Sequence, residues 1–171
     1  MQDLDKERLF LKLYDGYVDP MFRHCWFRVS DREKAKDITQ TAFEKTWEYL
    51  IRGGDIANPK AFLYRIANNL IIDAYRKKKE ESLDTLMEGG FDVGSNDHEN
   101  IFKNLTHQEI VKLLNALPLS YRDVLVMRYI DDLALSEIAS ITQEKENTIA
   151  VRIHRGINKL RDTLNKADQV R

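Results

Sequence analysis

Glycine, proline and cysteine are scarce in this chain, and long hydrophobic runs are absent. Its 171 residues include 7 Gly, 3 Pro and 1 Cys. The single cysteine excludes an internal disulfide and a cysteine-based zinc site. No apolar run reaches the ~20 residues of a membrane span, and the charged N-terminus differs from a signal peptide. The sequence therefore predicts no membrane insertion, and we expect the protein in the cytoplasm.

The sequence also lacks the residue combinations that catalysis or cofactor binding requires. The chain has no glycine-rich phosphate loop, no metal-ligand cluster and no nucleophile–base set, and its four histidines are scattered. We therefore expect no enzyme activity, no cofactor and no metal. What is present is 43% hydrophobic and 32% charged residues, which is typical of a globular protein. Helix-favouring residues abound and alternating, strand-like runs are absent, so the sequence predicts an all-α fold.

Charge is unevenly distributed, although the net charge is only −1. Four consecutive cations at 76–79 are followed by a stretch at 80–102 with seven acids and no lysine or arginine. That stretch holds three of the seven glycines and lacks sustained periodicity, which is typical of a flexible linker. We therefore predict two small helical domains, 1–80 and 107–171, joined by an acidic flexible linker at 81–106.

The C-terminal part has the pattern of a helix-turn-helix. Residues 134–140 read as a short amphipathic helix, 142–146 as a polar connection and 147–161 as a longer helix. In the longer helix, isoleucines fall on one face and cations on another. This arrangement can place the second helix in the major groove of DNA. A solvated surface helix of a bundle is the alternative interpretation.

Two helices of the first part carry faces that suit partners. A helix from the predicted N-cap Asp31 to about Leu50 has an acidic and amide-bearing face bordered by an aromatic edge, which suits a basic protein helix. A helix at 60–78 carries amides, guanidiniums and tyrosines, which suit a single DNA strand. The alternatives are a solvated face with Trp47 in the core, and an ordinary polar face whose tyrosines help the core.

Local signals predict further helix boundaries. Two separate helices, 6–14 and 20–29, are expected near the N-terminus, because Pro20 and the polar residues before it favour a break. Thr106 is the predicted N-cap of one C-terminal helix. Ser120 is the predicted N-cap of the next helix, 121–130.

Four segments, taken in order, resemble an alternative sigma factor of the extracytoplasmic-function group within the sigma-70 family. The match covers most of the chain and follows the family's order of core-binding, promoter-melting and −35-reading segments. The segments are AKDITQTAFEKTWEYL (35–50), NPKAFLYRIANNLIIDAYRKKK (58–79), LPLSYRDVLVMRYIDDLALSEIA (117–139) and NTIAVRIHRGINKLR (147–161).

The resemblance implies a protein without catalytic activity that binds the β′ and β subunits of core RNA polymerase. It would direct the polymerase to promoters and open the DNA. An anti-sigma factor is a further implied partner. The polymerase-contact residues would be Asp37, Gln40, Thr41, Phe43 and Trp47. The contacts to the single strand at −10 would be Tyr64, Arg65, Asn68, Asn69 and Arg76. The contacts to duplex DNA at −35 would be Glu146, Asn147, Thr148, Arg152 and Arg155.

Within these sets some roles are more specific. Asn69 is the best candidate for reading a flipped base. Arg152 and Arg155 would contact phosphates, although Arg155 could instead pair with Asp162 or Glu137. The chain departs from the family pattern at Gln143, where a turn glycine is common. A small residue is also common where this chain has Asn147, and polar or basic residues are common where it has Ala150 and Val151. Direct base contacts at −35 are therefore expected to be fewer.

Two other functions compete with this interpretation. A regulatory DNA-binding protein would use only the helix-turn-helix and would carry a ligand or receiver domain upstream, which the helical first half does not offer. A protein-binding helical adaptor, such as an anti-sigma-like antagonist, would not need the cationic and amide-bearing faces.

Overall fold

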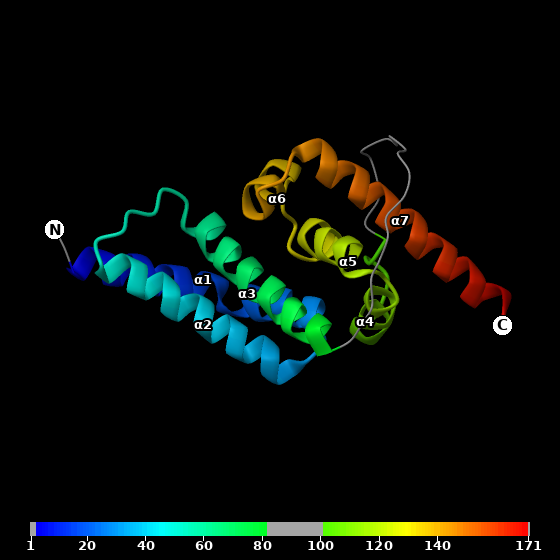
Figure 1. Cartoon of the computed structure of the whole chain (residues 1–171), viewed down its shortest axis with the longest axis horizontal. Helices are drawn as coiled ribbons and strands as arrows, with labels where there is room; N and C mark the ends of the chain where they lie inside the picture. Colours follow the sequence, from blue (N-terminus) through cyan, green and yellow to red (C-terminus); the bar gives the residue numbers. More distant parts are fainter. Residues whose placement is uncertain (1–2, 82–100, 171) are drawn as a thin grey trace. The chain divides into compact units, whose positions relative to one another are not determined.

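The computed structural model describes residues 3–81 and 101–170, and every regular element within these ranges is a helix (Figure 1). The predicted all-α fold is confirmed. The chain divides into two compact units, Met1–Asp84 and Thr85–Arg171. Most of the predicted acidic linker, 81–106, lies outside the described residues.

The first unit contains three helices, α1 (Asp3–Val29), α2 (Arg32–Ile51) and α3 (Pro59–Glu81), which pack side by side (Figure 1). The predicted N-cap of α2 is confirmed, because the Asp31 carboxylate accepts a hydrogen bond from the backbone N–H of Lys34 at 3.1 Å. The fully buried hydrophobic residues of this unit come from all three helices: Met21, Cys25, Ala35, Ala42, Leu63, Ala67 and Ile71.

α1 is one continuous helix, so the predicted break between 6–14 and 20–29 is wrong. Pro20 lies inside the helix, where a proline costs about 3 kcal/mol through a lost hydrogen bond and a steric clash. Leu13 and Met21, on the two sides of the predicted break, are both buried. Packing of one unbroken apolar face against α2 and α3 therefore outweighs the local penalty of the proline.

The second unit contains α4 (His107–Asn115), α5 (Leu119–Leu125), the π-helical turn η1 (Val126–Ile130), α6 (Leu135–Thr142) and α7 (Glu146–Gln169). Thr106 caps α4 as predicted, in a reciprocal capping box with Glu109. The prediction for Ser120 is wrong, because α5 begins at Leu119 with Pro118 as its N-cap and no side-chain cap. Proline is compatible with this boundary since its fixed φ suits a helix start.

α7 is held by an apolar stripe, with Ile149, Ile157 and Leu160 fully buried. At Gly156 the helix comes close to α5: a Cβ there would lie 3.0 Å from Leu125 Cδ1. A larger residue at this position would make a tight contact, so the buried Leu125 side chain would have to shift to accommodate it.

The residues just before α4 pack onto the second unit. Phe102 is buried, and its ring centroid lies 6.2 Å from that of Tyr129 in an edge-to-face contact. Burial raises the pKa of Tyr129 above 10.0, and the nearby cations Arg128 and Arg161 lower it in part. Among the described helices of both units, none combines the length and apolar character needed to cross a membrane.

Candidate functional site

A groove of about 1090 Å³ runs between α1 and α2. From α2 it is lined by Asp37, Gln40, Phe43 and Trp47, four of the residues that the sequence predicted as one contact face. Thr41, the fifth, is half-buried and does not line the groove. The opposite wall comes from α1, which the sequence analysis did not assign to any surface.

Aromatic side chains form the floor of this groove. The Phe10 ring centroid lies 5.2 Å from that of Trp47 and 6.2 Å from that of Phe43, and the Tyr14 centroid lies 5.0 Å from that of Phe43. Phe43 is only 3% exposed, because rings from α1 cover it. It therefore shapes the floor, whereas Tyr14 and Trp47 reach the surface. The spacing of Phe10 and Tyr14, one helical turn apart, is the signal that could have revealed the α1 wall.

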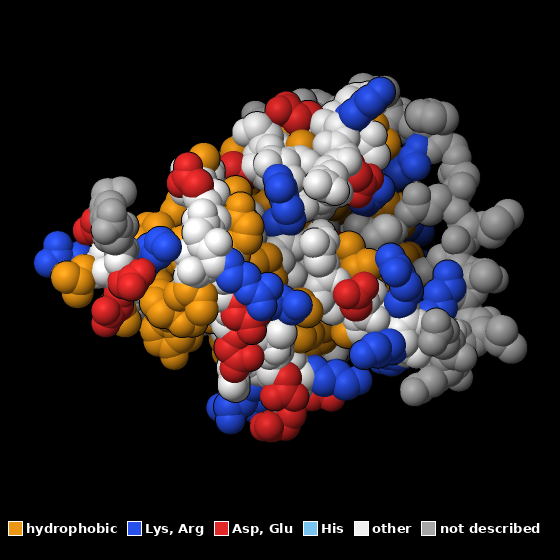
Figure 2. Space-filling model, turned by 60° about the vertical axis from the view of Figure 1, so that its left-hand side comes forward, with side chains coloured by type: hydrophobic (Ala, Val, Ile, Leu, Met, Phe, Trp, Pro, Cys, Tyr) orange, Lys and Arg blue, Asp and Glu red, His pale blue; other side chains and the backbone are white. Residues whose placement is uncertain are grey.

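Charged side chains of both signs surround the aromatic floor. The Gln40 amide donates to the Glu44 carboxylate at 2.8 Å, so the two form one polar edge. The remaining charged lining residues are Glu7, Asp19, Arg32, Glu33, Lys36 and Asp37. Figure 2 shows hydrophobic and charged side chains interspersed on the face that it draws. An apolar floor with a mixed charged rim suits an amphipathic helix of a partner protein.

The predicted DNA-strand face of α3 is partly core. Tyr64 is 2% exposed and Asn68 is 3% exposed, which corrects the prediction that they lie on an outer face. Arg28 of α1 donates through Nη1 to Asn68 Oδ1 at 2.8 Å, and the His24 ring meets the Tyr64 ring edge-to-face, with 5.1 Å between centroids. Because Arg28 satisfies the Asn68 carbonyl, an amide can occupy a position that the sequence pattern assigned to solvent.

The other predicted α3 residues remain accessible. Asn69 and Arg76 are exposed, and Arg65 is half-buried. The Arg76 guanidinium lies 4.0 Å from the Asp73 carboxylate, and both side chains are largely exposed, so the pair is weak and the cation is available. The cations at 77–79 are exposed as well and extend the positive end of the helix.

α6 and α7 form a helix-turn-helix, as predicted. Gln143 adopts the left-handed conformation, with φ 59° and ψ 36°. Its backbone N–H and that of Glu144 both donate to the carbonyl of Ala139, which closes the end of α6 with a left-handed cap. A glutamine therefore fills the turn position for which glycine is the more common residue.

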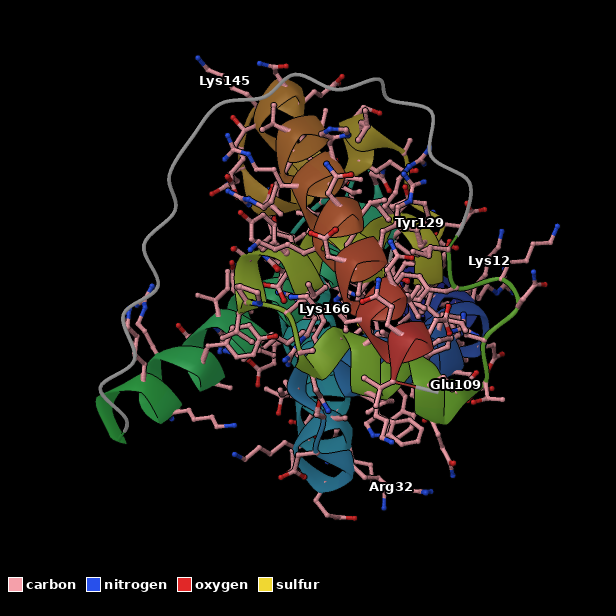
Figure 3. All side chains as sticks on the ribbon, turned by 90° about the vertical axis from the view of Figure 1, so that its right-hand side faces the viewer. Lys12, Arg32, Glu109, Tyr129, Lys145 and Lys166 are labelled. Carbon is pink, nitrogen blue, oxygen red and sulfur yellow. The ribbon has the colours of Figure 1, made fainter. Side chains whose placement is uncertain are left out.

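The start of α7 presents short polar side chains to solvent. Glu146, Asn147 and Thr148 are all exposed, and Lys145, labelled in Figure 3, lies beside them at the helix start. His154 is half-buried two turns after Asn147, with a ring nitrogen 3.3 Å from the Asn158 amide. Sequence reasoning left His154 unassigned, although its seven-residue spacing from Asn147 places both on one side of the helix.

The two arginines of α7 differ in their surroundings. Arg152 makes a bidentate ion pair with Glu144: Nη1 lies 2.9 Å from Oε1 and Nη2 lies 2.8 Å from Oε2. Arg155 is half-buried. Within the described parts of the chain it makes no ion pair with Glu137 or Asp162, and the Glu137 carboxylate instead accepts from the backbone N–H of Ala134.

Comparisons with known proteins agree with this architecture. The sigma-70 region 2 family matches residues 13–81, and the sigma-70 region 4 family matches residues 107–160. The extracytoplasmic-function (ECF) RNA polymerase sigma factor SigW of Bacillus subtilis is 33% identical, over 91% of this chain and 88% of that protein. The sigma factor SigV of the same species is 30% identical, over 94% and 93%.

Solved structures share the fold. The sigma factor RpoE from Bartonella quintana, in complex with the anti-sigma factor NepR, superposes with a TM-score of 0.69 at 23% identity, over 94% of this chain and 97% of that one. CnrH, in complex with the cytosolic domain of CnrY, gives a TM-score of 0.66 at 20% identity, over 94% and 90%.

Two helical units that match regions 2 and 4, with a groove on the first and a helix-turn-helix on the second, define a bacterial transcription initiation factor of the sigma-70 type. The chain belongs to the ECF group of RNA polymerase sigma factors. As an alternative sigma factor it directs promoter-specific transcription and has no catalytic activity of its own.

Proposed function

We propose that the chain binds core RNA polymerase through the α1–α2 groove and reads promoters through α3 and α7. The groove is the observation that carries this proposal, because it brings most of the predicted contact face together with an aromatic α1 wall. Its occupant is a helix of the β′ subunit, whose apolar side would cover Tyr14 and Trp47 while its polar side meets the charged rim. The protein would then act in the cytoplasm, together with polymerase.

For the −10 element, we propose that the outer side of α3 binds a single DNA strand. Asn69 is exposed and carries an amide that can bond a base edge. Arg65, Arg76 and the cations at 77–79 neutralise phosphates along the same helix. Tyr64 and Asn68 act from the core: their contacts with α1 hold α3 in place.

For the −35 element, the start of α7 enters the major groove of duplex DNA. Glu146, Asn147 and Thr148 are exposed there and reach base edges, and Arg155, further along the helix, contacts the backbone. RpoE was solved in complex with the anti-sigma factor NepR, and we propose that an anti-sigma factor binds this chain also.

Run-off transcription tests the proposed function. Purified chain and core RNA polymerase are incubated with a library of promoter fragments, and transcripts are sequenced. We expect a discrete set of start sites that share two upstream elements, absent with core polymerase alone. Transcripts that do not depend on the added chain would contradict the proposal. An Asn69→Ala chain, tested in parallel, should retain core binding and lose transcript yield at the same start sites.

A further inference from the structure

The Glu144–Arg152 ion pair joins the turn of the helix-turn-helix to the second turn of α7. Glu144 directly follows the left-handed residue Gln143, and its backbone N–H is already bonded to Ala139 at 3.2 Å. Its carboxylate accepts hydrogen bonds from both terminal nitrogens of Arg152. The turn is therefore fixed at its backbone and at its side chain, and the pair holds the turn against α7.

The same pair changes the charge that α7 offers to DNA. The side chains of Arg152 and Glu144 are 21% and 35% exposed, so both are partly removed from water. A guanidinium–carboxylate pair with two hydrogen bonds is also stronger than one with a single hydrogen bond. The Arg152–Glu144 pair has a net charge of zero. A protein that gives up one phosphate contact binds DNA with a correspondingly shallower salt dependence.

We propose that Glu144 is a specificity-determining residue of the −35 interface, because it withholds Arg152 from the DNA backbone and fixes the start of α7. Arg152 is then a positioning residue and Arg155 supplies the phosphate contact. Discrimination between −35 sequences rises, since less of the binding energy is independent of sequence. This inference rests on the proposed function of α7 and adds a role that the sequence had assigned to neither residue.

The test measures binding of the full-length chain to two fluorescent duplexes at several salt concentrations. One carries the −35 element found by run-off transcription, and the other has that element scrambled. Glu144→Gln releases Arg152 from this ion pair and should steepen the salt dependence by about one unit. At ~0.15 M salt, one added phosphate contact is expected to raise affinity for the scrambled duplex about fivefold, which lowers discrimination.

Four further variants complete the test. The double variant Glu144→Gln with Arg152→Gln keeps the net charge of the pair at zero and should leave the salt slope as in the parent chain. Arg155→Ala should reduce the slope by about one unit. Asp162→Asn, which removes an exposed acid farther along α7, should change affinity less than Glu144→Gln does. The charge swap of Glu144→Arg with Arg152→Glu should restore the parental slope and discrimination, even where a single variant folds poorly by circular dichroism.

A reduced salt slope in the double variant of Glu144→Gln with Arg152→Gln would show that Arg152 contacts phosphate and would overturn the proposal. An unchanged slope in Glu144→Gln would overturn it as well. Failure of the proposed function gives a different result: the parent chain would then bind both duplexes equally at every salt concentration.

Discussion

The two helices proposed to contact DNA, α3 and α7, are anchored in different ways. α3 is held to α1 through buried polar groups, with Asn68 bonded to Arg28, and the Tyr75 hydroxyl donates to the Arg28 carbonyl at 2.8 Å. α7 is held by an apolar stripe, and its ion pair with Glu144 lies near the surface. The position of α3 therefore depends on buried hydrogen bonds in addition to its apolar residues Leu63, Ala67 and Ile71, whereas that of α7 depends on apolar packing.

Breaking the buried polar network should have the largest effect. Arg28→Ala leaves a cavity in place of a fully buried side chain and leaves the Asn68 carbonyl without its donor, so we expect a loss of about 2–5 kcal/mol in the free energy of unfolding of the first unit. Both tryptophans lie in α1 and α2, so their fluorescence during urea denaturation reports on this unit. Asn69→Ala, at an exposed neighbour, is the control and should leave the midpoint unchanged. Equal midpoints for the two variants would contradict the network's role.

Asn68 and Asn69, adjacent amides of α3, have different proposed roles: Asn69 contacts a DNA base, and Asn68 holds α3 in position. Asn69→Ala should lower open-complex formation by about 1–3 kcal/mol, the value of one base-specific contact, without changing the urea midpoint. Asn68→Ala should lower the urea midpoint, because its carbonyl holds Arg28. Permanganate reactivity of the promoter measures opening. Parental reactivity in Asn69→Ala, on a fully duplex template, would remove Asn69 from the proposed contacts.

Close packing of α7 can be tested at its glycine. Gly156→Ala gains about 1 kcal/mol of helix propensity. The new methyl group would, however, sit 3.0 Å from a buried leucine, and overpacking costs about 1–3 kcal/mol. We therefore expect a net loss of about 1 kcal/mol, seen by circular dichroism during thermal unfolding. Gly16→Ala in α1, where nothing lies within 4 Å, should stabilise instead. A stabilising Gly156→Ala would show that α5 and α7 can separate freely.

A substitution in the turn between α6 and α7 should change the free energy of unfolding least. Gln143→Gly relieves a left-handed conformation that disfavours residues with a Cβ, but it also raises the entropy of the unfolded chain. A net gain of about 0.5–1 kcal/mol is expected. Thermal unfolding measures it, with Gln40→Gly in the middle of α2 as a destabilising control. A loss of stability at Gln143 would show that its side chain has a role beyond the turn.

The contrast between the helices explains what the sequence could predict. Isoleucines at helical spacing define the inner side of α7 without ambiguity, so its orientation and the helix-turn-helix were predictable. In α3, Tyr64 and Asn68 suit either a DNA strand or a core, and only the approach of Arg28 from α1 decides between them. The α1 wall of the groove was missed for a related reason: Phe10 and Tyr14 lie within the predicted helix 6–14, but the partners that they contact, Phe43 and Trp47, are distant in sequence. The Glu144–Arg152 pair likewise depends on the geometry of the turn.

The affinity of the full-length chain for core RNA polymerase tests the central claim most directly. Asp37→Lys reverses an exposed charge on the rim of the α1–α2 groove and should weaken binding at least tenfold, which is about 1.4 kcal/mol. Asp15→Lys, on the same unit but outside the groove lining, should bind as the parent chain does. Equal affinities for both variants, with parental circular dichroism, would contradict the assignment of the groove to polymerase.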